Sequence, residues 1–202
     1  MRRRALLAAS GGSVSVPTGV SIATESKGFI PHASWDSQDT PVGVAVSNGE
    51  VTLILSLKTS SVKWASSTGD IAGVPTFTST TALKNYMDGQ AYTKALADYF
   101  TATNLAAPVA MKETITISGK VLSGYIGSTG EWLMVSSYAS DVMAAYSALG
   151  YSFVSSTTNY WTSCERASGS TWICEWPTSG AVDWTALSKT NARVLRAFFR
   201  YK

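Results

Sequence analysis

Two apolar runs joined by a short polar segment predict a β-hairpin in the first third of the chain. Residues 42–46 and 51–58 are rich in Val, Leu and Ile, and Asn48-Gly49 lies between them. Both of these turn residues accept the positive φ angles of a tight hairpin, so the pair favours antiparallel strands on either side. We treat residues 62–64 as a candidate extension of the same sheet.

Two later segments instead show the residue spacing of amphipathic helices. The first covers residues 89–101, with Asp88 as its N-cap. The second begins at Ser128, where the serine hydroxyl and the Glu131 carboxylate fit a capping box, and it ends at Gly150. In the first helix, one apolar face is formed by Tyr92, Ala95, Leu96, Tyr99 and Phe100. We expect the apolar stripe of the second helix to be core, and its members are Trp132, Val135, Ala139, Val142, Met143 and Tyr146.

The other globular segments are expected to be short strands. Residues 114–121 have β-propensity, Pro108 indicates a connection, and residues 151–202 alternate apolar runs with polar turns. This order predicts an α+β fold in which two helices pack on small antiparallel sheets. Residues 1–28 show little periodicity and are assigned to an extended N-terminal arm, which leaves residues 29–202 as one domain.

Composition changes this picture in one respect. Only 14% of the residues are charged, against about a quarter in ordinary domains, and the net charge is +3. A surface that is polar through Ser and Thr hydroxyls is typical of an extracellular or particle-bound protein. The basic residues are scattered except at the chain ends, so we expect no nucleic-acid partner. No apolar run approaches the roughly 18 residues of a membrane span, so we expect no membrane insertion.

No residue set indicates catalysis. His32 is the single histidine, which excludes a multi-histidine metal site, and no nucleophile elbow accompanies it. We therefore expect no metal, no cofactor and no enzymatic activity. Paired-carboxylate glycosidase chemistry stays open as an alternative, because sequence alone does not show which acidic groups face one another. Its candidate members are Asp36, Glu131, Glu165, Glu175 and Asp183.

The two cysteines lie on either side of a polar turn near the C-terminal end. If the turn is centred on Gly169, Cys164 and Cys174 are directly opposite one another, at a separation that suits a cross-strand disulfide. Two reduced thiols packed side by side are the other interpretation, and they fit assembly in a reducing cytosol. Both remain open at this point.

Several motifs in the second half of the chain resemble a C-type-lectin-like domain. They are Gly130-Glu131-Trp132, residues 160–163, residues 172–176 and Arg196-Ala197-Phe198, and the resemblance covers about residues 40–202. It is closest to the branch found in structural and tropism proteins of bacteriophages that infect gut bacteria, including crAss-like phages, and in related bacterial surface proteins. Ile126-Gly127 departs from the usual Leu-Pro, and the two cysteines are not the usual long-range pairs of C-type lectins.

The resemblance implies a non-enzymatic virion structural protein, such as a head-decoration, head-fibre or tail-associated subunit, assembled in the host cytoplasm. The arm would then bind other virion proteins, and homo-oligomers such as trimers would strengthen adhesion to a host-surface glycan or protein. The alternative is a secreted or cell-surface carbohydrate-binding module of a bacterium. Formylglycine-generating enzymes share the fold, but the cysteine arrangement here does not resemble theirs.

Under this hypothesis the scaffold leaves one hairpin turn free to bind a ligand. We expect Tyr160, Trp161 and Trp176 to be core anchors. A solvated loop without a ligand is the other interpretation of the turn. The candidate ligand-binding residues are Glu165, Arg166, Ser168, Ser170 and Trp172.

Overall fold

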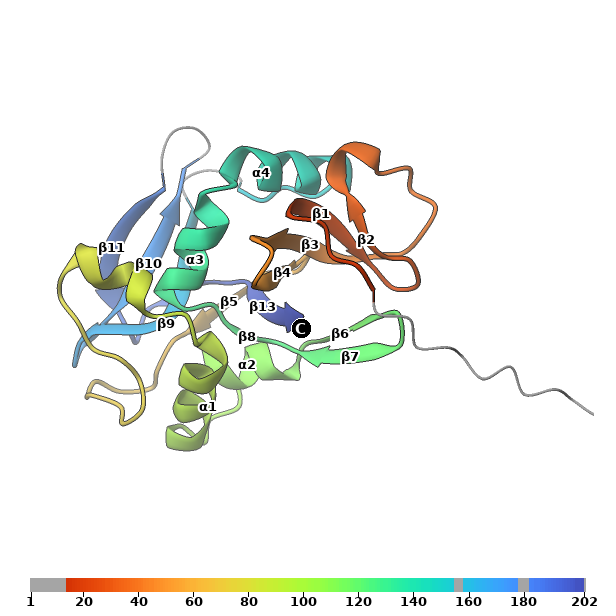
Figure 1. Ribbon diagram of the computed structural model, residues 1–202. Coiled ribbons are helices and arrows are strands. Elements are labelled where there is room, and N and C mark those ends of the chain that lie inside the picture. The colour runs from red at the N-terminus through yellow and green to blue at the C-terminus, as the bar shows by residue number, and fades with distance from the viewer. Residues whose placement is uncertain (1–13, 155–157, 178–181, 202) are drawn as a thin grey trace, which may run out of the picture.

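The computed structural model describes residues 14–154, 158–177 and 182–201. It confirms an α+β protein with mostly antiparallel sheets. Figure 1 shows helices α3 (Thr129–Ser136) and α4 (Ala139–Ala148) along one side of the strands. Helices α1 (Gly89–Tyr99) and α2 (Ala106–Lys112) lie along the opposite side. The strands between the helices form two larger sheets. Each sheet combines strands from the first third of the chain with strands from its last third.

The first sheet has six strands in the order β2-β1-β3-β4-β13-β8, and every neighbouring pair is antiparallel. The predicted hairpin forms its centre, with Ser47 opposite Thr52 and Gly49 at a φ of 94°. The strands are β1 (Gly19–Thr24), β2 (Gly28–Pro31), β3 (Pro41–Ser47), β4 (Thr52–Ser56), β8 (Tyr125–Ile126) and β13 (Ala197–Tyr201).

The second sheet has five strands in the order β11-β10-β9-β12-β5, and β12 and β9 run parallel. Its strands are β5 (Ser60–Lys63), β9 (Thr158–Ala167), β10 (Ser170–Trp176), β11 (Asp183–Ser188) and β12 (Ala192–Leu195). The expected extension at residues 62–64 therefore belongs to this second sheet rather than to the hairpin sheet. A separate two-stranded ribbon consists of β6 (Thr114–Ile117) and β7 (Lys120–Ser123).

Both faces of the six-stranded sheet are buried. Leu53 and Leu55 pack in a core with Trp132 and Tyr146 of the helices above, whereas Ile54, between them, packs in the other core. The same alternation places Phe198 in the first core and Phe199 in the second. A strand buried on both faces reads as a continuous apolar run, which is the pattern seen in residues 53–55.

Four α-helices cover the sheets in the described part of the chain, not the two that we expected. The first predicted helix is α1 (Gly89–Tyr99), and the Asp88 side chain caps it by accepting a hydrogen bond from the Ala91 N–H at 3.2 Å. The short α2 (Ala106–Lys112) was not predicted, because Pro108 suggested a connection. Proline is tolerated in the first turn of a helix, where its missing N–H would have no partner anyway.

The second predicted helix is divided into α3 (Thr129–Ser136) and α4 (Ala139–Ala148). Its capping box is confirmed, because the Glu131 carboxylate accepts from the Ser128 N–H at 2.8 Å and the Ser128 hydroxyl accepts from the Glu131 N–H. At the break, the hydroxyls of Ser136 and Ser137 donate to carbonyls of the preceding turn. Such local bonds compete with the helical pattern, which accounts for the division.

The boundary of the N-terminal arm was predicted wrongly. Residues 19–24 form β1, which pairs with both β2 and β3 inside the six-stranded sheet, and Ile22 and Ala23 are fully buried. Val14 already packs against the second core, the one that contains Ile54 and Phe199. The folded domain therefore includes residues that we had assigned to the arm, and residues 1–13 lie outside the described part of the chain.

Candidate functional site

A groove of about 460 Å³ lies beside the β10–β11 edge of the five-stranded sheet. One of its walls comes from β11 and β10, and the other comes from the loop that leads into the short 3-10 helix η2 (Thr80–Asn85). In Figure 1 the yellow segment containing η2 lies beside β10 and β11. The groove is lined by Thr78, Ser79, Thr80, Arg166, Trp172, Trp184, Thr185 and Ala186.

Trp172 forms the rigid base of this groove. Its indole N–H donates to the Phe77 carbonyl at 2.9 Å, and its ring stacks on the Phe77 ring with centroids 5.6 Å apart. Phe77 in turn stacks on Tyr86 at 4.4 Å. Trp172 is only 3% exposed, so its ring supports the bottom of the groove but offers little accessible area to a ligand. The stack also fixes the loop that precedes residues 78–80.

Trp184 supplies the accessible aromatic surface. It is half-buried, and the regular β10–β11 register puts it opposite Cys174, with Ala186 opposite Trp172. Side chains two residues apart share one face of a strand, so Trp184 and Ala186 extend the face that Trp172 begins. The small Ala186 side chain leaves the space beside Trp172 open.

The remaining lining is polar. The exposed hydroxyl residues 78–80 lie along one side, and the Ser79 side chain caps η2 by accepting from the Thr81 N–H at 3.3 Å. Arg166 is exposed near the end of β9, and its guanidinium carbon lies 5.7 Å from the centroid of the Trp172 ring. Such a position allows a cation–π contact while the guanidinium N–H groups remain able to donate to a ligand.

The structure brings together two of the five predicted ligand-binding residues, Arg166 and Trp172. Ser168 and Ser170 are at the hairpin turn and do not line the groove. The prediction that Glu165 is an exposed ligand contact is wrong, because Glu165 is fully buried. Its carboxylate forms an ion pair with Lys189, and it accepts hydrogen bonds from the Thr76 hydroxyl at 2.8 Å and from the Ile71 N–H at 3.3 Å.

Sequence reasoning missed the other half of the site, which β11 and residues 78–80 provide. The β-propensity of residues 184–187 could have indicated a strand beside the hairpin. Nothing in the Ser/Thr-rich stretch before residue 80 indicates that its hydroxyls face this strand. That contact depends on the Phe77–Trp172 stack, which is a tertiary interaction.

The expected pairing of the two cysteines is wrong. Cys174 is opposite Tyr160 in the β9–β10 register, and extra residues of β9 form an irregularity around Cys164. The N–H groups of Ser163 and Glu165 bond outside the ladder, to the carbonyls of Gly127 and Pro75 at 3.0 and 2.9 Å. These outside partners stabilise the irregular stretch of β9. Both cysteines are buried free thiols, and they pack in different apolar clusters.

The buried carboxylates of the glycosidase alternative already have structural partners. Glu131 forms an ion pair with Arg200 at 2.5 Å and accepts from the Tyr125 hydroxyl at 2.9 Å. Burial raises the pKa of Glu131, although the hydrogen bonds from Ser128 and the charge of Arg200 act in the opposite direction. Glu131 and Glu165 are therefore each enclosed by protein partners and do not face one another across a cavity.

The three remaining candidate carboxylates are also separated from the groove. Asp36 accepts a hydrogen bond from the Gln38 N–H in an exposed loop. Glu175 and Asp183 are opposite one another in the β10–β11 register, but neither lines the groove. Asp183 accepts a hydrogen bond from the Trp184 N–H at 2.7 Å.

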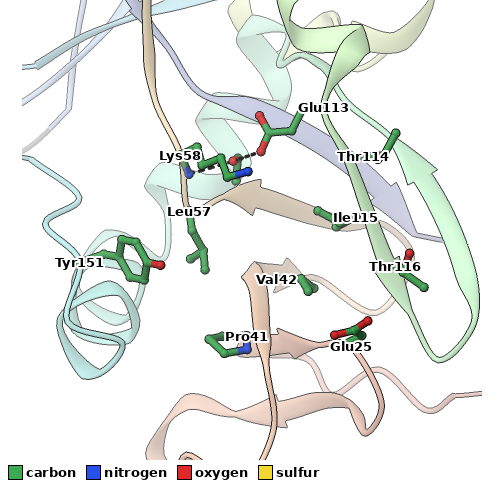
Figure 2. A pocket seen from close by; sticks show the side chains of 11 residues that line it. Glu25, Pro41, Val42, Leu57, Lys58, Glu113, Thr114, Ile115, Thr116 and Tyr151 are labelled. Atoms are coloured by element: carbon green, nitrogen blue, oxygen red, sulfur yellow. Dashed lines mark hydrogen bonds between the residues drawn. The ribbon is translucent and has the colours of Figure 1, made fainter.

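A second groove, of about 300 Å³, lies between β3, the end of β4 and β6. Figure 2 shows its two carboxylates, Glu113 and Glu25, at opposite ends, with Ile115 and Val42 between them in this view. Glu113 accepts a hydrogen bond from the Ser56 hydroxyl. The aromatic residue of this groove is Tyr151, and the groove has no indole ring. We therefore treat the Trp172–Trp184 groove as the stronger candidate for carbohydrate.

Within the described ranges, no group of three or more His, Cys, Asp or Glu side chains could hold a metal ion. The helices of these ranges are also too short or too polar to cross a membrane.

Comparison with known proteins supports the fold alone. No family model and no curated protein matches the chain. A crystal structure of a fimbrial protein from Bacteroides ovatus is similar, with a TM-score of 0.58 and 13% sequence identity. The match covers 92% of this chain and 49% of that one, so the chain spans about half the length of its structural neighbour.

Proposed function

We propose that this protein is a non-enzymatic recognition subunit that binds carbohydrate through the groove between Trp172 and Trp184. The observation that carries the proposal is the composition of the groove. A half-buried indole, a row of hydroxyls and one guanidinium line a groove of about 460 Å³. Sugars present apolar C–H faces that pack on aromatic rings, and their hydroxyls bond to polar side chains placed around them.

The C-type-lectin-like architecture is part of this proposal. Its support is the position of the motif residues, because Trp132, Tyr160, Trp161 and Phe198 are all fully buried. The Trp132 indole N–H donates to the Trp161 carbonyl at 3.2 Å, and the Trp132 ring stacks on Tyr160 with centroids 4.9 Å apart. Motif residues that pack together in the core form a scaffold. Such a scaffold is compatible with a family whose surface residues vary.

The proposed setting is the virion of a bacteriophage. The protein would be a head-decoration, head-fibre or tail-associated subunit, and it would form homo-oligomers such as trimers, since weak single sites gain from multivalency. Residues 1–13 are the proposed attachment to other virion proteins. The alternative setting is the surface of a bacterium. The similarity in fold to a fimbrial protein supports this alternative.

A binding experiment tests the carbohydrate proposal. Purified protein is screened on a glycan array, and hits are measured by isothermal titration calorimetry. Trp184→Ala is expected to weaken binding by about tenfold or more, because it removes the accessible ring. Tyr151→Ala is the matched control, since Tyr151 is an exposed aromatic in the other groove. A protein that binds no glycan, or a Trp184→Ala variant that binds normally, would contradict the proposal.

A separate experiment tests the setting. Copy number in purified particles and in bacterial surface fractions is compared for the full chain and for a truncation that removes residues 1–13. The truncation must stop before Val14, since loss of β1 would remove a buried strand from the central sheet. The virion proposal expects the full chain in particles and the truncated chain outside them. Recovery only from the bacterial surface would support the alternative.

A further inference from the structure

Arg166 gives the carbohydrate groove a charge that forms no ion pair with a carboxylate of the described chain. It is the single ionisable residue among those that line the groove, where the others are Thr, Ser, Trp and Ala. In the described ranges the ion pairs are Lys94–Asp98, Lys189–Glu165 and Arg200–Glu131, so Arg166 belongs to none of them. The groove therefore carries a net positive charge.

The acidic residues that adjoin the lining residues in sequence or in strand register do not themselves line the groove. Glu165 precedes Arg166 directly, but it is fully buried and paired with Lys189. Asp183 precedes Trp184, and alternation along β11 turns it to the opposite face of the strand. Glu175 is opposite Asp183 in the register and is turned to that same opposite face. The local sequence is thus acidic, but the groove is not.

From these positions we infer that the groove selects acidic carbohydrates, with Arg166 pairing to the carboxylate of a uronic-acid-type sugar. The inference rests on the proposed carbohydrate function and names the class of sugar. A guanidinium presents parallel N–H donors that match a carboxylate in two-point contact. The ring of the sugar then lies on Trp184, and residues 78–80 offer hydroxyls to the sugar hydroxyls.

Trp172 contributes to this selection by positioning Arg166. Its ring is fixed by the hydrogen bond to the Phe77 carbonyl and by the stack on Phe77. The guanidinium lies over this fixed ring, so less side-chain freedom is lost when a ligand binds. Trp172 is therefore a positioning residue, whereas Arg166 and Trp184 are the expected ligand contacts.

The test uses two probes that differ in charge and little else, an oligogalacturonate and its methyl ester of the same length. Calorimetry on the full chain is expected to show tighter binding of the acid form, by about tenfold, as one charge-assisted two-point contact would give. Added salt should reduce this preference, because it screens the pair. Arg166→Gln should remove the preference while retaining affinity for the ester.

The matched control is Lys63→Gln, which removes the same charge from the exposed β5 edge of the same sheet. It should leave the preference unchanged, and near-ultraviolet circular dichroism should show that every variant is folded. Equal binding of acid and ester by the wild type would overturn the inference but not the carbohydrate proposal. Equal loss of preference in Arg166→Gln and Lys63→Gln would also overturn it. Failure to bind any glycan would remove the carbohydrate proposal itself.

Discussion

Lys189 and Glu165 form an ion pair in which both side chains are completely buried. The pair links the long loop before η2 to the five-stranded sheet. The Lys189 ammonium also donates to the Gly69 carbonyl at 2.7 Å, and the Lys189 carbonyl accepts from the N–H groups of Trp64 and Ala65, each at 3.0 Å. On the other side, Glu165 holds residues 71 and 76. A single pair thus positions the loop that carries one wall of the candidate groove.

Breaking this pair is expected to destabilise the protein strongly. Glu165→Gln leaves a buried ammonium without its countercharge, and such a change costs about 3–5 kcal/mol of unfolding free energy. Chemical denaturation followed by tryptophan fluorescence measures the loss. The control is Asp98→Asn, which breaks the exposed Lys94–Asp98 pair and should cost no more than about 0.5 kcal/mol. Similar small losses in both variants would contradict a stabilising role for the buried pair.

The two cysteines are expected to be unreactive in the folded protein. Burial raises the pKa of the Cys164 thiol to about 12, and it raises the pKa of Cys174 well above the ordinary value. Only the thiolate reacts, so a chromogenic disulfide reagent at about pH 8 should label neither residue until denaturant is added, and then label both. Rapid labelling of the native protein would contradict this arrangement. So would a failure to label the chain after it is denatured without reductant, because that result would indicate a disulfide.

Arg196 is a buried cation held by aromatic rings. Its guanidinium carbon lies 4.6 Å from the Tyr146 ring centroid and 4.7 Å from that of Phe153, and one N–H donates to the Ser56 carbonyl at 2.6 Å. Arg196→Lys keeps the charge but loses the planar group, so we expect a loss of about 1–3 kcal/mol in denaturant unfolding. Arg193→Lys is the comparison, because the Arg193 guanidinium donates to the carbonyl of its neighbour Ala192. An Arg196→Lys variant as stable as Arg193→Lys would refute the role of the aromatic cage.

Local signals predicted those parts of the fold that depend on neighbours in sequence. The Asn48-Gly49 turn and the caps at Asp88 and Ser128 are formed as expected, since each depends on residues within a few positions. The membership of strands in sheets was not predictable in this way. Residues 60–63 pair with β12, which lies far along the chain, and no local pattern distinguishes this partner from β4.

The candidate site was predictable only in part, for the same reason. Arg166 and Trp172 were identified because they border one hairpin turn. Regular alternation then placed Cys164 opposite Cys174, but the partners of Ser163 and Glu165 in other segments shift the register of β9. The same tertiary contacts bury Glu165, although the next residue, Arg166, is exposed.

Gly43 is expected to tolerate no side chain, because two strands approach closely at this position. A Cβ atom there would lie 2.5 Å from Cγ2 of Ile54 and 2.8 Å from the Leu55 carbonyl oxygen. Gly43→Ala must therefore displace β3 from β4 in the doubly buried sheet, and we expect a loss of about 1–3 kcal/mol, measured as a lower denaturation midpoint. Gly169→Ala is the matched control, since its Cβ would meet nothing closer than Cγ2 of Thr68 at 3.7 Å. Its stability should change by no more than about 0.5 kcal/mol. Equal stability of the two variants would show that β3 and β4 are not so closely apposed at Gly43.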